Sequence, residues 1–215
     1  MNPIVIAYHL VWTAYGCWLP NDPRGSGSSV IRSDVLAEIG ELHRGRKKVQ
    51  PPGKVVGAFY DEAEDCLRHP LVTFDEPERA LIAAAFAQTV IGQSYTCYGC
   101  AIMPDHVHVL MRKHKHSAEG IARSLMESSR LRLIESGNRA PTHPVWIAGN
   151  GWKVFLDHPD DIWRTIKYIE TNPIKDGLPA HDWPFVSVYD GWPLHPGYSP
   201  NSPYAKRLRA IGRYP

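Results

Sequence analysis

Several features that would place this sequence in a common class of protein are scarce or missing. Its 215 residues include only four cysteines, too few for the disulfide framework of a secreted domain. No apolar run approaches the ~20 residues that a membrane-spanning helix needs. The first residues, MNPIVIAYHLVW, contain neither the basic start nor the small-residue cleavage site of a signal peptide. We therefore expect a cytoplasmic protein with no membrane partner.

A strong net charge is missing as well. The formal net charge is only +2 with histidine neutral, so overall basicity does not indicate a nucleic-acid partner. Two local clusters are basic, 43-HRGRKK-48 and 206-KRLRAIGR-213. Each is either a solvated surface segment, which is the commoner case, or a surface that contacts a phosphate backbone.

A second cysteine pair is also absent. The segment 97-CYGC-100 has the spacing of some zinc and redox sites, but no other CxxC accompanies it. In a regular strand, residues three apart point to opposite faces. We therefore expect these two thiols to pack in the interior and not to bind metal.

The order of the expected elements predicts an α+β fold. The proportions of hydrophobic (43%) and charged (21%) residues are those of one folded domain. The pattern strand, helix, strand, strand, helix, strand is the ferredoxin-like split βαβ arrangement with an antiparallel sheet. One additional helix and an irregular tail follow it. The expected strands are 4–15, 95–103, 106–112 and 152–156, and the expected helices are 34–48, 77–93, 117–137 and 160–171.

Local signals set the ends of the two later helices. Ser117 is the expected N-cap of the first of them. Asp157 is the expected N-cap of the second, and Pro173 should stop it. The remainder, about 179–215, is rich in Pro and Trp and predicts mostly irregular structure.

The strand 106-HVHVLM-111 carries two histidines on one face. Strand alternation places His106, His108 and Leu110 together, opposite an apolar face that suits the core. Two imidazoles at this spacing can share one metal ion. They can equally be two partly buried histidines with local hydrogen bonds, and for an isolated HxH pattern that second interpretation is favoured.

The helix 160–171 adds a polar face with reactive groups. Ile162, Ile166 and Ile169 form its core stripe. At about 100° per residue, Tyr168 points away from that stripe. Such a residue is either a surface tyrosine or a phenol held ready to react. Arg164, Asn172 and Lys175 share this polar side. Asn172 can present an amide oxygen to a metal, or it can simply be the residue at which the helix ends.

These segments together resemble the HUH single-tyrosine transposases, in particular the REP-associated tyrosine transposase branch. The resemblance is carried by 103-MPDHVHVLM-111, by 168-YIETNPIKDGL-178 and by the opening loop 12-WTAYGCWLPNDPRGS-26. It covers roughly residues 4–178. It implies a catalytic domain in residues 1–178, followed by a C-terminal extension in residues 179–215.

The resemblance implies a metal-dependent enzyme of bacterial DNA transposition and recombination. Tyr168 would attack a phosphate of single-stranded DNA near a hairpin and form a 5′-phosphotyrosine intermediate. His106, His108 and Asn172 would hold Mg²⁺ or Mn²⁺. Two positions depart from the family pattern: Asp105 stands where an Asn is frequent, and Asn172 replaces a glutamine as the third ligand.

DNA contact is expected from basic side chains outside this catalytic set. Aromatic residues of the tail, Trp183, Phe185, Trp192 and Tyr198, either stack on unpaired bases or, as is more common, pack the tail onto its own domain. The candidate DNA-binding residues are Arg123, Arg130, Arg164, Lys175, Arg44, Arg46, Lys47 and Lys48.

Alternative functions remain open at this point. A related HUH nickase of replication or conjugation belongs to the same class. A catalytically silent, domesticated protein that binds DNA hairpins belongs to another, and a metal-binding module unrelated to DNA is a third. The chain can act as a monomer or as a homodimer.

Overall fold

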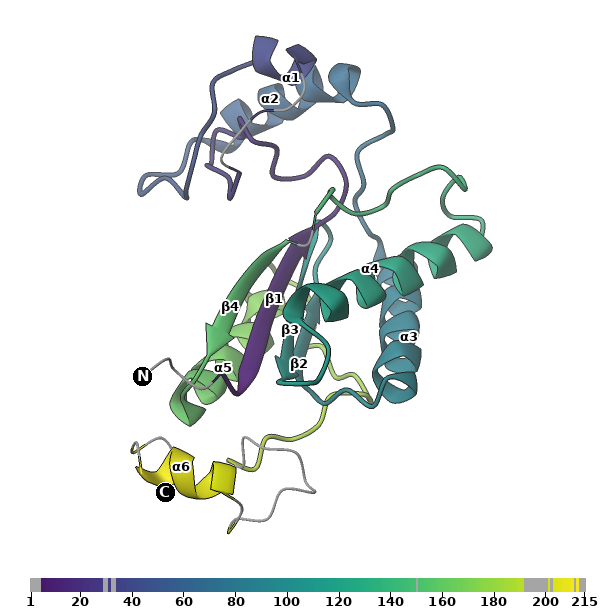
Figure 1. Ribbon diagram of the computed structural model, residues 1–215. Coiled ribbons are helices and arrows are strands. Elements are labelled where there is room, and N and C mark those ends of the chain that lie inside the picture. Colours follow the sequence, from purple (N-terminus) through teal and green to yellow (C-terminus); the bar gives the residue numbers. More distant parts are fainter. Residues whose placement is uncertain are drawn as a thin grey trace.

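The sheet at the centre of the molecule has four antiparallel strands in the order β2-β3-β1-β4 (Figure 1). The computed structural model describes residues 5–28, 31, 34–149, 151–191, 201, 203–210 and 212. The strands are β1 (Ala7–Thr13), β2 (Cys97–Ile102), β3 (His106–Arg112) and β4 (Trp152–Leu156). The helices are α1 (Asp34–Glu38), α2 (Gly53–Cys66), α3 (Glu76–Gly92), α4 (Ala118–Glu135), α5 (Pro159–Lys175) and α6 (Pro203–Ala210).

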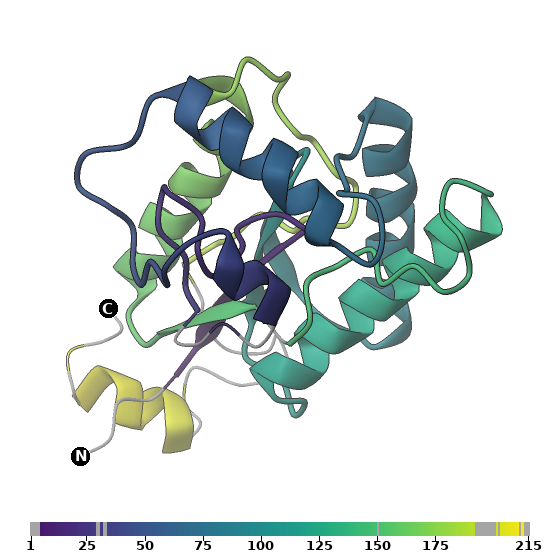
Figure 2. The same ribbon diagram turned by 90° about the horizontal axis from the view of Figure 1, so that it is seen from above.

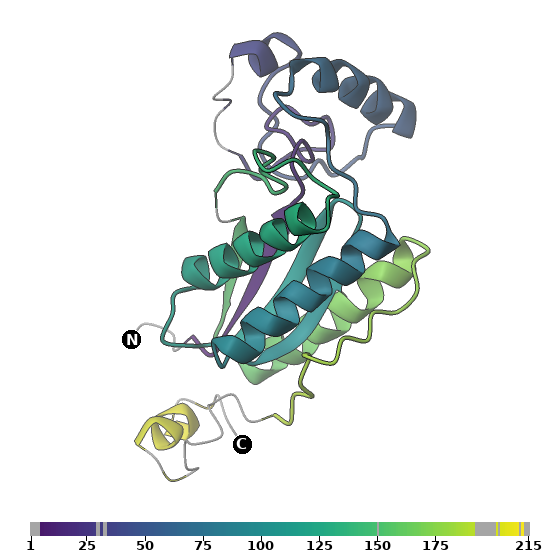
Figure 3. The same ribbon diagram turned by 90° about the vertical axis from the view of Figure 1, so that its right-hand side faces the viewer.

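The connectivity confirms the α+β, ferredoxin-like prediction. The order β1, α3, β2, β3, α4, β4 places each crossover helix between strands that are not neighbours in the sheet. Helices α3 and α4 cover one face, and α5 covers the other (Figure 3). Within the described residues, no helix is long and apolar enough to cross a membrane.

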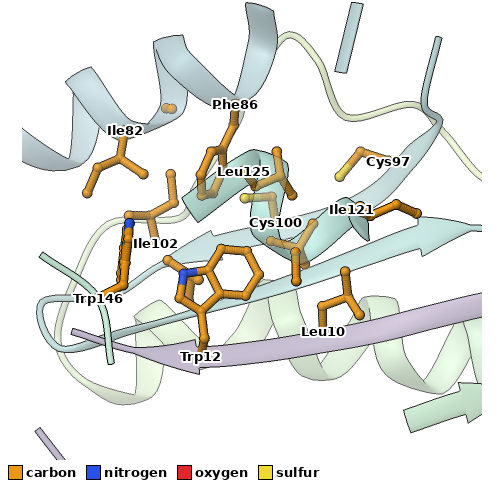
Figure 4. Packing of buried hydrophobic residues seen from close by; sticks show 14 of the residues in the cluster. Leu10, Trp12, Ile82, Phe86, Cys97, Cys100, Ile102, Ile121, Leu125 and Trp146 are labelled. Carbon is orange, nitrogen blue, oxygen red and sulfur yellow. The ribbon is translucent and has the colours of Figure 1, made fainter. Parts of the chain in front are cut away.

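The main core lies between the sheet and the helices α3 and α4. Strand alternation sends Val107, Val109 and Met111 to this side, as expected from the apolar half of the β3 pattern. Figure 4 shows strand side chains such as Trp12 meeting Phe86 of α3 and Leu125 of α4. This face is therefore closed by ordinary hydrophobic packing.

The second core lies under α5, on the face that carries the β3 histidines. Ile162, Ile166 and Ile169 are buried there, as the helical stripe predicts. Leu110 of β3 belongs to the same cluster. A Cβ built on Gly99 would lie 3.4 Å from the Ile169 side chain, an ordinary van der Waals distance, so α5 packs directly on β2 at this position. Residues of β3 that precede Leu110 on this face consequently lie beside α5.

Helix ends agree with the prediction at α4 and differ at α5. Ser117 caps α4 through its side chain, which accepts a hydrogen bond from the Gly120 N–H. The N-cap of α5 is His158 and not Asp157, since the His158 Nδ1 accepts from the Asp160 N–H. Pro173 does not stop α5, which continues to Lys175. Pro173 is itself buried, and its packing along the apolar stripe offsets the backbone hydrogen bond that proline cannot make.

The cysteine pair also differs from the prediction. A register shift between Cys97 and Gly99 interrupts the alternation of β2, so Cys97 and Cys100 both enter the main core. Both are buried free thiols. Burial raises the pKa of Cys97 to about 12 and raises that of Cys100 as well, which fits the expected packing role.

The segment between β1 and α3 differs from the prediction in its helices. The predicted helix 34–48 is reduced to α1, and α2 was not predicted. Figure 2 shows α1 and α2 over one end of the sheet. Tyr60 of α2 donates to the Asp22 carboxylate and accepts from the Trp18 N–H. These bonds hold α2 against the loop that follows β1.

The C-terminal extension is only partly irregular. Residues 179–190 contain no helix or named strand, although Val186 pairs with Cys97 at the edge of β2. Helix α6 follows, and its Ala205 and Leu208 are buried in the second core. Trp183 and Phe185 pack against the main core, which confirms packing for these two tail aromatics. Trp192, Tyr198, Ile211 and Arg213 lie outside the described residues.

Candidate active site

The two histidines of β3 converge on one side of the sheet. His106 and His108 have ring centroids 4.9 Å apart and ring planes nearly perpendicular. His108 is 6% exposed, whereas His106 is partly open to solvent. Two imidazoles this close can direct nitrogen lone pairs toward a single point, which is the requirement for sharing an ion.

A third histidine, which the sequence reasoning left without a role, lies beside this pair. His9 of β1 pairs in register with Leu110, and Val11 pairs with His108. Its Nε2 is 3.1 Å from the His108 Nδ1, and the two rings are stacked with centroids 5.2 Å apart. The detectable signal was the alternation of β1, which puts His9 among its α5-side residues. Its position next to His108 depends on the strand register, which the sequence does not specify.

Helix α5 brings Tyr168 and Asn172 to the same place. The Tyr168 ring lies edge-on to His108, with centroids 5.3 Å apart, and it remains 44% exposed. Tyr168 therefore lies at the border of the packed face of α5. The helical pattern had predicted a position pointing away from that face. One turn later, the Asn172 Nδ2 lies 3.4 Å from the His106 Nε2. Residues from two segments about 60 positions apart thus meet at one site.

The hydrogen bonds of His106 determine which of its nitrogens is available. Its Nδ1 is 2.5 Å from the Asp105 Oδ1, so the imidazole proton is expected on Nδ1, where it donates to the carboxylate. The Nε2 then carries a lone pair toward Asn172. Burial by itself would raise the pKa of Asp105. The hydrogen bond and the electrostatic attraction of His106 outweigh burial, so the pKa of Asp105 is lowered.

The other two histidines are held neutral. Burial lowers the pKa of His9 to about 4. Burial holds the pKa of His108 far below its ordinary value, and the neighbouring His106 and His9 lower it further. Neutral imidazole is the form that binds metals, so no proton has to leave these rings at neutral pH.

The donor set fits a divalent cation, provided that the third ligand is an amide. In the part of the chain that the structure describes, no three His, Cys, Asp or Glu side chains form a metal-binding group. His106 Nε2 has Asn172 beside it, and rotation about the Asn172 Cβ–Cγ axis turns the amide oxygen toward the same space. A carboxylate that orients a ligating imidazole, as Asp105 can for His106, is usual around protein-bound metals.

Two of the predicted basic residues lie near Tyr168. The Lys175 Nζ is 5.8 Å from the Tyr168 ring centroid, within the range of a cation–π contact. Arg164 lies one turn before Tyr168 and forms an ion pair with Asp161 of the same helix. Lys175 thus contacts the Tyr168 ring, whereas the charge of Arg164 is paired with Asp161.

The remaining predicted DNA-binding residues lie elsewhere. Arg123 and Arg130 line one open cavity on α4, on the opposite side of the sheet from α5. Arg130 is bound through two hydrogen bonds to Glu127. The exposed residues 44–48, which we call the basic loop, pair with the loop after β1 through a bridge between Ser26 and Arg44. The basic loop contains Arg44, Arg46, Lys47 and Lys48.

Comparisons with known proteins find structural but not sequence similarity. Neither the protein-family models nor the curated proteins give a match. One similar solved structure is a REP-associated tyrosine transposase bound to a REP hairpin, with a TM-score of 0.43 and 13% identity, over 100% of this chain and 86% of that one. Another is a candidate transposase from Deinococcus radiodurans R1, with a TM-score of 0.38 and 14% identity, over 84% of this chain and 95% of that one. Likeness at this level establishes no shared activity.

Proposed function

We propose that this protein is a divalent-metal-dependent transesterase that cuts and rejoins single-stranded DNA, near hairpins, through a tyrosine. The observation that carries the proposal is the meeting of Tyr168, His108, His106 and Asn172 at one half-open site. The resemblance of the two sequence segments to single-tyrosine transposases supports the same chemistry. A merely structural tyrosine would have no need of the two imidazoles, of His9 and His108, that lie edge-on to its ring.

Tyr168 is the nucleophile in this proposal. Its phenol oxygen forms a bond to phosphorus while the bond from phosphorus to the 3′ oxygen breaks, and the 3′ oxygen leaves with a proton as a free hydroxyl. The phenol proton passes to solvent or to a nearby base. The product is a 5′-phosphotyrosine, and attack by a 3′-hydroxyl reverses the step. The phosphodiester energy is conserved in the covalent bond, so rejoining needs no nucleotide cofactor.

The surrounding residues prepare this step. Lys175, whose ammonium lies 5.8 Å from the Tyr168 ring, favours development of negative charge on the phenol oxygen. His106, His108 and Asn172 would hold Mg²⁺ or Mn²⁺, which when bound polarises the scissile phosphate and stabilises its developing charge. His9 and Asp105 orient the two ligating imidazoles.

The proposal is tested with labelled hairpin oligonucleotides that carry single-stranded flanks. We expect a denaturation-resistant protein–DNA adduct with Mg²⁺ or Mn²⁺, none with chelator, and none from Tyr168→Phe. Tyr15→Phe is the matched control: it removes a hydroxyl outside the site, where Tyr15 contacts His69 and His143 edge-on. It should form the adduct as the unsubstituted protein does.

Two outcomes would redirect the assignment. Tight hairpin binding without an adduct under any metal would identify a DNA-hairpin-binding protein that has lost cleavage. An adduct that persists in Tyr168→Phe would show that another residue is the nucleophile.

A further inference from the structure

The backbone of Trp18 adopts a conformation that bulky residues rarely take. Its φ is +54°, in the left-handed region that favours glycine. Such a conformation persists only where the surroundings enforce it, and it is concentrated at functional sites. The contacts of Trp18 therefore show what the fold gains by holding an indole ring here.

Three contacts fix the Trp18 ring and its backbone. The backbone N–H donates to the Tyr60 hydroxyl at 2.7 Å. The indole Nε1 donates to the Asp105 Oδ2 at 3.3 Å. The Arg24 guanidinium lies over the ring, 4.0 Å from its centroid. Through Asp105, which also binds His106, the indole is one residue away from the candidate metal ligands.

Arg24 is held as firmly as the ring that it covers. It makes hydrogen bonds to both carboxylate oxygens of Asp22 and to the Tyr60 hydroxyl. Asp22 is fully buried. The indole is thus preorganised by a network that reaches from α2 to the start of β3, and binding a flat ligand there would cost little ordering of the protein.

Trp18 lines a cleft beside the candidate active site. The cleft encloses about 330 Å³, near the lower end of the ~300–1,000 Å³ of small-molecule pockets. Trp152, which is 63% exposed, forms part of its wall together with Thr13. Thr13 pairs in register with His106, which places the cleft at the His106 end of the site.

Glycine keeps the cleft open on one side. Gly27 also lines it, and a Cβ built there would lie 3.8 Å from the Trp152 ring. A longer side chain at this position would occupy space next to the indole. Two indoles and a wall without a side chain form a site for a flat aromatic group, since aromatic rings recognise such groups by stacking.

The charges next to the cleft favour a polyanion. Ser26, which precedes Gly27, forms a bridge to Arg44, and the Lys47 N–H donates to the Arg24 carbonyl at 3.1 Å. These backbone bonds place the exposed cations of the basic loop beside the Gly27 wall. The Asp22 carboxylate is paired with Arg24, so its charge is largely compensated. A nucleobase in the cleft would have its neighbouring phosphates near the basic loop.

We propose that the cleft between Trp18 and Trp152 binds one unpaired nucleobase adjacent to the scissile phosphate, with the basic loop on the flanking backbone. The proposal rests on the proposed function, since it takes the scissile phosphate to lie at Tyr168. The base in the cleft would set the position of the phosphate relative to Tyr168, and Trp18 and Trp152 would contribute to the choice of cleavage position.

The test is abasic scanning of a single-stranded oligonucleotide, with affinity measured by fluorescence anisotropy in Tyr168→Phe so that cleavage does not interfere. One abasic position should weaken binding by roughly 5- to 100-fold, the range for loss of one base–aromatic stack. Trp152→Ala should weaken binding of the intact oligonucleotide by a similar factor and should abolish the effect of that abasic position. Trp152→Phe should retain most of both.

The control is Trp163→Ala, which removes another half-exposed indole from a different cavity, between α5, β2 and residues 181–189. It should show the same abasic profile as the parent protein. If Trp152→Ala also keeps that profile, the cleft does not bind a base. Adduct formation is scored separately with Tyr168 intact, so loss of the proposed function and loss of this inference are distinguishable.

Discussion

Asp105 connects the two parts of the molecule for which we propose a role in DNA binding and cleavage. One carboxylate oxygen faces the His106 Nδ1 and the other accepts from the Trp18 indole. The first contact sets the tautomer of a candidate metal ligand. The second positions the indole that lines the cleft. Asp105, where the transposases that the sequence resembles frequently have Asn, is therefore a residue with two partners.

Replacing Asp105 should separate these two effects. Asp105→Ala removes both acceptors, and we expect Mn²⁺ affinity to fall by about 10- to 100-fold, as for other residues that orient a metal ligand. Asp105→Asn retains one acceptor for His106 and should lose less. Isothermal titration with Mn²⁺ measures this without reference to activity. Equal affinity in all three proteins would contradict the orienting role.

Single-residue patterns predicted part of the site. Alternation correctly placed His106 and His108 on one face, because a strand of regular geometry leaves no other choice. It could not place His9 next to them, because that neighbour depends on how β1 and β3 pair. The Cys97–Cys100 prediction was wrong about the faces for a related reason, since a bulge is not visible in the spacing.

At the scale of elements, predictions were accurate where packing and local propensity agree. The stripe of Ile162, Ile166 and Ile169 predicted α5 and its buried face. Helix α2 was missed because its sequence, GKVVGAFYDEAEDC, contains two glycines and a valine pair that favour other conformations. Its position is fixed by distant partners of Tyr60, namely Asp22 and Trp18, which no local pattern contains.

The pairing of the basic loop with the loop after β1 depends on Gly25. Its φ is +93°, and a Cβ there would lie 1.9 Å from the Gly45 carbonyl oxygen. Gly25→Ala should separate the two loops and destabilise the protein by about 1–3 kcal/mol. Gly45→Ala is the matched control, with φ +79° and open space around the added carbon.

Hydrogen exchange at the Ser26 and Gly45 amides reports this separation directly, because each of these N–H groups donates across the two loops. Exchange should accelerate more in Gly25→Ala than in Gly45→Ala. The reverse order would mean that the close contact does not hold the basic loop in place.

The two basic elements should differ in their contribution to DNA binding. Lys47 and Lys48 are exposed, whereas Arg130 is paired with Glu127. Replacing both lysines with serine should reduce the slope of log affinity against log salt by about 1.4, at ~0.7 for each phosphate contact on a single strand. Arg130→Ser should change the slope much less. A larger change of the slope for Arg130→Ser would indicate that the DNA runs along α4 instead.

The whole molecule keeps several histidines neutral, and this makes its stability depend on pH. The pKa of His9 is lowered to about 4, and burial also lowers the pKa of His108 and of His143. Below the ordinary histidine pKa of ~6.5, the unfolded chain binds protons that the folded chain excludes. Acid therefore favours unfolding, and the stabilisation from His9 is lost progressively as pH falls from ~6.5 through about 4.

We expect metal-free protein to lose on the order of 1–3 kcal/mol of unfolding free energy between pH 7 and pH 5. Urea unfolding in the presence of chelator measures this loss. His9→Phe, which keeps an aromatic ring on His108, should show a smaller pH dependence. Stability that rises on acidification would contradict the neutral state of these rings.

At the same scale, the two faces of the sheet have different roles. The face under α3 and α4 is closed by apolar packing, while the face under α5 combines a smaller apolar core with the histidines. The split βαβ order leaves one face of the sheet for an additional helix, but the sequence did not predict that α5 packs against the histidine face. The structure adds that α5 covers only part of that face, and that Tyr168 lies at its open border.

The central claim is that Tyr168 becomes covalently attached to DNA, and peptide mass spectrometry tests it most directly. After reaction with a hairpin oligonucleotide and Mn²⁺, nuclease and trypsin digestion should release the peptide YIETNPIK, residues 168–175, in which Tyr168 is the only tyrosine. We predict that this peptide carries a nucleotide through a phosphate on Tyr168. A nucleotide found on any other peptide, with residues 168–175 unmodified, would contradict the account.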